Sequence, residues 1–163
     1  MKKTALSHCP ARAALFGIML VMSVGLSGCA MPRITLHEDA LTPQEHLELG
    51  ISYEEKGELK HAEEQYEQAK DLPEAWLYLG NVAFASEKWL RAERRYEKAI
   101  RLLPKDPRPR NNLAWLYYTR KRRLDRAKQL AQEAVALAPR GEEKQYRDTL
   151  TSIRNAKDIQ ALE

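Results

Sequence analysis

The sequence predicts an all-α protein in which three helical hairpins stack into a solenoid and a last helix covers the end of the stack. Leucine followed by a small residue recurs at Leu49, Leu79 and Leu113. After a bend, each of these positions is followed by a second set of residues at similar spacing, most of them small. Repetition at a period of about 20–50 residues is typical of stacked helical units, each of which buries its apolar face against its neighbours.

We expect the repeats at residues 43–72, 73–106 and 107–141. Small residues after the leucine, and at the start of the second helix, would let two helix backbones approach where they cross. Proline would end the second helix of the later repeats. The recurring positions of the second helices are Ala62, Tyr66 and Ala69, then Ala92, Tyr96, Ala99 and Pro104, then Ala127, Ala131, Ala134 and Pro139.

Both ends of the array carry recognisable signals. Thr42, with proline next and Glu45 three residues on, predicts a capping box at the start of the first helix. Residues 142–163 are expected to form a capping helix and tail. Tyr146, Leu150 and Ile153 would share one face of that helix, and its polar face would shield the last repeat from water.

The N-terminal residues 1–28 have the organisation of a secretory signal peptide. Basic residues come first, then the uncharged run 13–26, then small residues and Cys29. The run is shorter than the roughly 20 residues of a membrane span. Leu26-Ser27-Gly28-Cys29 resembles the bacterial lipobox, which implies cleavage before Cys29, a diacylglycerol on its sulfur and an acylated amino terminus, with palmitate as the acyl chain. The alternative is an ordinary cleavage site followed by a chance cysteine.

Residues 29–42 would then be a lipidated tether. Ala30 follows the cysteine, and in this position the chain resembles lipoproteins that are sent to the outer membrane. The resemblance implies that the body faces the periplasm. Anchoring in the inner membrane is the alternative. No disulfide is expected, because Cys9 leaves with the leader and Cys29 is the lipid site.

Charge argues against a nucleic-acid partner. The chain has 27 Lys and Arg against 23 Asp and Glu, and loss of the leader's three basic residues leaves 24 against 23. The basic excess therefore belongs largely to the leader, and nucleic-acid binding loses its main support. The basic run 120–123 is expected to be a solvated bend, with contact to anionic lipid as the sharper alternative.

The repeats resemble the tetratricopeptide repeat, whose pattern is Trp, Leu-Gly, Tyr, Ala, aromatic, Ala and Pro over 34 residues. The resemblance implies a right-handed solenoid with a concave groove lined by the first helix of each repeat. In repeat one the groove positions would be Gln44, Leu47, Ile51 and Glu54, and Glu74 opens the set of repeat two. The predicted partner-binding residues are Leu77, Asn81, Phe84, Arg108, Asn111, Asn112, Trp115 and Tyr118.

The same family has a clamp that binds C-terminal carboxylates through lysine, asparagine and arginine. Asn81 and Asn112 match it, and Arg147 falls near its last position. Leu77 and Glu143 replace its two lysines, so we do not predict a carboxylate clamp. For the aromatic groove residues the alternative is packing against the capping helix, and for Asn112 it is bracing the turn between repeats.

Catalysis has little support in the sequence. No phosphate loop, metal-spaced histidine pair or nucleophile elbow is present. His37 is expected in a solvated linker and His46 and His61 at the surface. The pairs Glu54-Glu55 and Glu63-Glu64 are expected to be solvated carboxylates with ordinary pKa values.

The resemblance therefore implies a non-enzymatic scaffold without metal, cofactor or small-molecule substrate, which holds a protein partner of the bacterial envelope in its groove. The alternatives are a self-associating structural subunit, a helper of an exported peptidase and, least favoured, a hydrolase.

Overall fold

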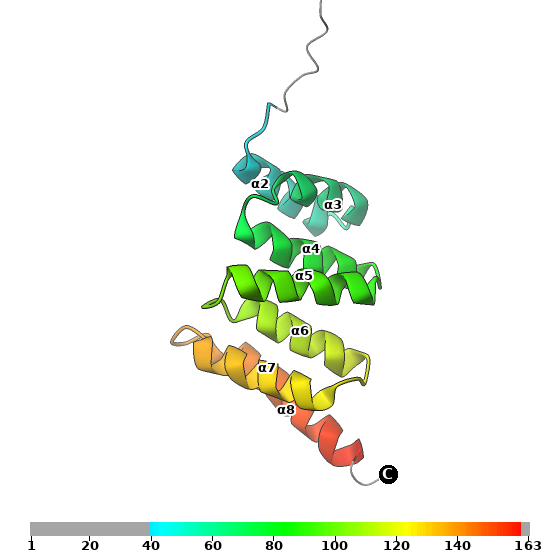
Figure 1. The fold of residues 1–163 in the computed structure, drawn as a ribbon, viewed down its shortest axis with the longest axis vertical. Coiled ribbons are helices and arrows are strands. Elements are labelled where there is room, and N and C mark those ends of the chain that lie inside the picture. Colours follow the sequence, from blue (N-terminus) through cyan, green and yellow to red (C-terminus); the bar gives the residue numbers. More distant parts are fainter. Residues whose placement is uncertain (1–39, 161–163) are drawn as a thin grey trace, which may run out of the picture. The chain divides into compact units, whose positions relative to one another are not determined.

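The computed structural model describes residues 40–160, which are all-α (Figure 1). This confirms the predicted fold class. The helices are α2 (Pro43–Glu55), α3 (Leu59–Gln68), α4 (Pro73–Ala85), α5 (Trp89–Leu102), α6 (Arg108–Thr119), α7 (Leu124–Leu137) and α8 (Glu143–Gln160). The predicted signal peptide, the Cys29 lipid site, the tether up to residue 39 and the last three residues lie outside the described part.

Consecutive helices form the hairpins α2–α3, α4–α5 and α6–α7, and α8 packs on α6 and α7. The first helix of each hairpin also contacts the first helix of the next, so α2, α4, α6 and α8 form one row. No helix among residues 40–160 combines the length and the apolarity needed to cross a membrane.

The ends of the array follow the sequence signals. The Glu45 amide donates to Thr42 Oγ1 at 3.3 Å, and the Thr42 amide donates to Glu45 Oε2 at 2.7 Å, which confirms the capping box. Tyr146, Leu150 and Ile153 of α8 are buried as predicted. Leu150 and Ile153 belong to one apolar cluster with the second and third hairpins.

The helix crossings have a more specific cause than backbone approach. A Cβ built on Gly50 would lie 2.4 Å from Tyr66 Cε1, and one on Gly80 would lie 2.4 Å from Tyr96 Cε1. The glycines therefore make room for tyrosine rings that lie against the first helix. In the third hairpin Ala114 and Ala131 take these two positions, and both are fully buried.

The three bends share one backbone conformation. Gly57, Glu87 and Lys121 have φ angles of 75°, 57° and 48°. In each bend the amide after this residue bonds a carbonyl five residues back, at 2.9, 2.8 and 3.0 Å. This is the left-handed C-cap that glycine favours, and only the first bend has glycine there.

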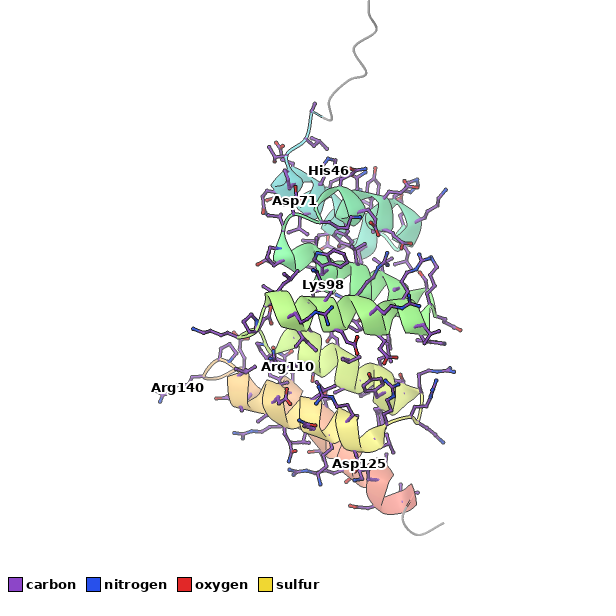
Figure 2. The ribbon with its side chains drawn as sticks, viewed as in Figure 1. His46, Asp71, Lys98, Arg110, Asp125 and Arg140 are labelled. Carbon is purple, nitrogen blue, oxygen red and sulfur yellow. The ribbon has the colours of Figure 1, made fainter. Side chains whose placement is uncertain are left out.

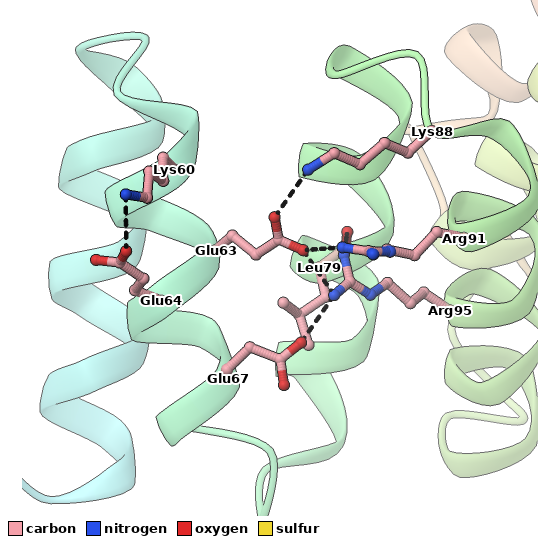
Figure 3. Close-up of polar contacts among 8 residues, drawn as sticks. All are labelled: Lys60, Glu63, Glu64, Glu67, Leu79, Lys88, Arg91 and Arg95. Carbon is pink, nitrogen blue, oxygen red and sulfur yellow. Dashed lines mark hydrogen bonds and ion pairs between the residues drawn. The ribbon is translucent and has the colours of Figure 1, made fainter.

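A partly buried ionic cluster, with Arg95 and Glu63 at its centre, joins the first two hairpins (Figure 3). The Arg95 guanidinium, from α5, contacts Glu63 at 2.8 Å and Glu67 at 2.7 Å and donates to the Leu79 carbonyl at 3.1 Å. Lys88 and Arg91 also bind Glu63, at 3.2 and 3.1 Å. Burial acts to raise the pKa of Glu63, but the hydrogen bonds from Arg95 and Lys88 and their charges lower it overall.

The predictions that Glu63 and His46 are solvated were wrong. The Glu63 side chain is only 17% exposed because the second hairpin covers it. His46, labelled in Figure 2, belongs to the first helix of the first hairpin. It is buried at 5% exposure, and its Nδ1 contacts Gln65 Oε1 at 2.7 Å. His61 is exposed, as predicted. The sequence did not indicate that side chains of α5 would cover Glu63, or that side chains of α3 would cover His46.

Candidate functional site

The row of first helices contains a pocket of about 300 Å³. We call it the central pocket. Its lining combines aromatic, amide and hydroxyl groups with one carboxylate, and comes from α2, α4, α5, α6 and α8. The lining residues are Glu54, Asn81, Phe84, Tyr96, Asn111, Asn112, Trp115 and Thr149.

Five of the eight predicted groove residues line this pocket, namely Asn81, Phe84, Asn111, Asn112 and Trp115. These residues of α4 and α6 thus lie around one pocket, and their role in partner binding stays a prediction.

The other three predicted residues lie elsewhere. Leu77 is 2% exposed and belongs to the apolar core, so it is not available to a partner, and its inclusion needs correction. An apolar side chain at this position turns into the hairpin instead of outward. Arg108 is held by Asp106, with Nη2 at 2.6 Å from Oδ2. Tyr118 packs on the core and its ring centroid lies 5.0 Å from that of Trp115.

An amide network crosses from the second to the third hairpin. Asn112 Nδ2 donates to Asn81 Oδ1 at 2.9 Å, and the Tyr96 hydroxyl donates to the same oxygen at 3.1 Å. Both lone pairs of that oxygen are thus used. Burial raises the pKa of Tyr96, and the Glu54 charge adds to the effect, so the hydroxyl keeps its proton as a donor. The network fixes the two asparagines relative to each other across the second and third hairpins.

Glu54 is the single carboxylate of the pocket. Its Oε2 accepts a hydrogen bond of 2.7 Å from the Tyr66 hydroxyl. Burial raises the pKa of Glu54 above its ordinary value, and the tyrosine bond offsets part of that rise. The prediction of an ordinary, solvated Glu54 was therefore wrong. Glu55, next in sequence, is exposed as predicted.

Aromatic rings form the apolar part of the wall. Trp115 is 39% exposed where it lines the pocket. The Phe84 ring packs edge-on against Trp89, with centroids 5.5 Å apart. Trp115 and Phe84 are thus held by neighbouring rings while they line the pocket, which makes them preformed contact surface.

Asn111 carries an unsatisfied acceptor. Its Oδ1 is the buried side-chain polar atom of residues 40–160 that has no hydrogen-bond partner. A buried acceptor without a donor costs about 1–3 kcal/mol. Asn111 therefore has acceptor capacity that the described residues leave unsatisfied in this conformation.

Two lining residues, Tyr96 and Thr149, were not expected in the groove, since the sequence indicates packing for Tyr96 and a capping helix for Thr149. Glu54 was expected among the groove positions of repeat one, but as a solvated carboxylate. The equivalence between α8 and the first helix of a further repeat could have indicated Thr149. Among residues 40–160, no group of three His, Cys, Asp or Glu side chains is arranged to hold a metal ion.

Comparison with known proteins agrees with this geometry. Residues 73–106, the second predicted repeat, match the tetratricopeptide repeat model. The fold is a tetratricopeptide-repeat fold. No curated protein matches the chain.

Solved tetratricopeptide-like structures cover most of the chain at low identity. The first tetratricopeptide repeat domain of Spaghetti (RPAP3), bound to the HSP90 peptide SRMEEVD, has 20% identity and a TM-score of 0.65, and the match covers 76% of this chain and 98% of that one. PcrH in complex with the chaperone binding region of PopD has 16% identity and a TM-score of 0.65, covering 74% and 97%. A T3SS complex from Aeromonas hydrophila has 15% identity and a TM-score of 0.67, covering 94% and 99%.

Proposed function

We propose that this tetratricopeptide-repeat protein binds an extended segment of a protein partner along the row α2, α4, α6 and α8, centred on the central pocket. The observation that carries the proposal is the exposed Trp115 beside the fixed Asn81–Asn112 pair. Tryptophan dominates many binding hot spots. An amide can both donate to and accept from a peptide backbone.

Two solved structures with this fold are complexes with a segment of another protein, which supports the proposal of a segment as ligand. The Spaghetti (RPAP3) domain is bound to a seven-residue peptide, and PcrH to a region of PopD. The role proposed here is a non-catalytic scaffold without cofactor, nucleic acid or small-molecule substrate.

We also propose that the scaffold is a lipoprotein of the bacterial envelope, acylated at Cys29. The order of basic residues, apolar run and Leu26-Ser27-Gly28-Cys29 supports this. Ala30 supports the outer membrane with the body facing the periplasm. Several acyl chains would hold the protein firmly, since each buried methylene contributes about 0.8 kcal/mol.

The binding proposal is tested by crosslinking and pull-down of the protein from its own cells. Trp115→Ala should lose the partner while keeping the fold, because the side chain is partly exposed. Leu90→Ala is the matched control, since Leu90 is a 64% exposed apolar residue outside the central pocket. Equal recovery of the partner by both variants would contradict the groove assignment.

The anchor is tested by mass spectrometry of the mature amino terminus. We expect a chain that begins at an acylated Cys29, and a Cys29→Ser variant that is released from membranes. A mature chain with an unmodified Cys29 would contradict the lipoprotein proposal and leave the groove proposal standing.

A further inference from the structure

We infer that the central pocket accepts a lysine or arginine side chain of the partner segment. This deepens the proposed function and rests on it. The pocket carries one carboxylate, Glu54, and no Lys, Arg or His lines it within the described part of the chain. Its volume of about 300 Å³ is at the small end for ligand sites and fits one side chain better than a whole metabolite.

The polar atoms of the pocket mainly need donors. Asn81 Oδ1 already accepts two bonds, whereas Asn111 Oδ1 has none. Within residues 40–160 the Glu54 carboxylate accepts from Tyr66 and has no cationic partner. Ammonium and guanidinium groups are donors only and positively charged. One such group would satisfy Glu54, and rotation of Asn111 would bring a second acceptor to it.

The aromatic wall fits the same ligand. Trp115 and Phe84 line the pocket together with Glu54. The face of a tryptophan ring attracts a cation electrostatically, and the attraction is strongest in desolvated sites. An aliphatic side chain would cover the carboxylate and give it no donor, and an acidic side chain would add like charge beside it.

The surrounding charge acts in the same direction. Helices α2 and α4 carry Glu45, Glu48, Glu54, Glu55 and Glu74, and neither has a lysine or an arginine. The two arginines of α6 are already paired, Arg108 with Asp106 and Arg110 with Glu133. Helices α2 and α4 thus put negative charge at the first-hairpin end of this row, while α8 carries four basic and three acidic residues. That negative end would steer a basic segment toward the pocket, which Glu54 of α2 lines.

The test uses the full chain in neutral detergent and capped seven-residue peptides. The peptides are Ala and Ser with one central Arg, Lys, Glu or norleucine. Binding is followed by the NMR signal of the Trp115 indole N–H, assigned with Trp115→Phe. We expect saturable shifts with the Arg and Lys peptides, and at least about tenfold weaker binding of the Glu and norleucine peptides, the ratio that 1.4 kcal/mol produces.

Glu54→Gln keeps the side-chain shape and an acceptor for Tyr66 but removes the charge. We expect it to weaken the Arg peptide about tenfold, whereas Glu55→Gln, the exposed neighbour, should change affinity less than twofold. Unfolding curves of both variants confirm that they fold.

Two outcomes would overturn the inference. One is binding of the Glu or norleucine peptide at Trp115 as tight as that of the Arg peptide, which leaves the groove proposal intact. The other is an Arg peptide affinity that is the same in Glu54→Gln as in the parent chain. The groove proposal itself would fail by a different result: in the pull-down, the Trp115→Ala variant would capture as much partner as the parent chain.

Discussion

The second and third hairpins fill equivalent positions with different residues. In the second, Gly80 makes room for the Tyr96 ring, and Arg95 pairs across to the first hairpin. In the third, the corresponding residues are Ala114, Ala131 and Leu130, all buried and apolar. Between the second and third hairpins, glycine and tyrosine are therefore both replaced by alanine. Glycine is needed only where a tyrosine ring lies against it.

The tyrosine also reaches the groove side. Tyr66 and Tyr96 donate to Glu54 and Asn81 of their own hairpins. The third hairpin has no such tyrosine, and its Asn112 is held by Asn81 of the second hairpin instead. In the first two hairpins the glycine–tyrosine pair thus sets the packing of the hairpin and also holds its pocket residue, Glu54 or Asn81.

Among these substitutions, Tyr96→Ala should lower the free energy of unfolding the most. Removing a buried aromatic costs about 3–5 kcal/mol, from lost burial and from the cavity, and it also frees Asn81. Urea unfolding measures the loss. A loss below about 1 kcal/mol would show that the ring is not a main packing element of the second hairpin.

Arg95→Leu gives the second hairpin the residue of the third. It should cost about 3 kcal/mol, the low end for breaking a buried ion pair, because Lys88 and Arg91 remain on Glu63. The reference is Leu130→Ala, which should lose about 2–5 kcal/mol through a cavity. If Arg95→Leu were neutral, the ionic cluster would contribute no net stability.

The same cluster predicts a pH dependence. The pKa of Glu63 is lower in the folded chain than its ordinary value of 4.5. A depressed carboxyl pKa stabilises the fold above the unfolded pKa, and that contribution is lost as pH falls through the folded one. Thermal unfolding at pH 7 and pH 3 should therefore differ less for Glu63→Gln than for the parent chain.

Gly80→Ala should cost about 1–3 kcal/mol, the range for overpacking. In a Tyr96→Ala background the same change should instead stabilise by about 0.5–1 kcal/mol, since alanine favours helix over glycine. A double-mutant cycle of unfolding free energies measures this reversal. Additive effects at the two sites would break the proposed pairing.

Glu87→Gly and Lys121→Gly should have the smallest effects. Both residues have positive φ at the bend where the first hairpin has Gly57. Glycine removes the steric cost of that conformation, which is about 1–2 kcal/mol, but loses more entropy on folding. We expect a net gain of about 0.5 kcal/mol in thermal unfolding for each, and a loss would show that the side chains matter more than the backbone.

The sequence predicted the hairpins, the capping box and five residues of the central pocket because these depend on spacing along one helix. Leu77, His46 and Glu63 were misplaced because their burial depends on which side chain of another helix covers them. Glu54 was misread for the same reason, since Tyr66 of the following helix holds it. The sequence showed Tyr66 and Tyr96, but not that their rings lie on Gly50 and Gly80, because that contact depends on how the second helix packs on the first.

The central claim is that a partner binds along the row of first helices at Trp115. A photoreactive benzophenone side chain at position 115, compared with one at Arg94 on the exposed side of α5, tests it in living cells. The account predicts a crosslinked protein partner from position 115 and little or none from position 94. Crosslinking from position 94 with none from position 115 would contradict it.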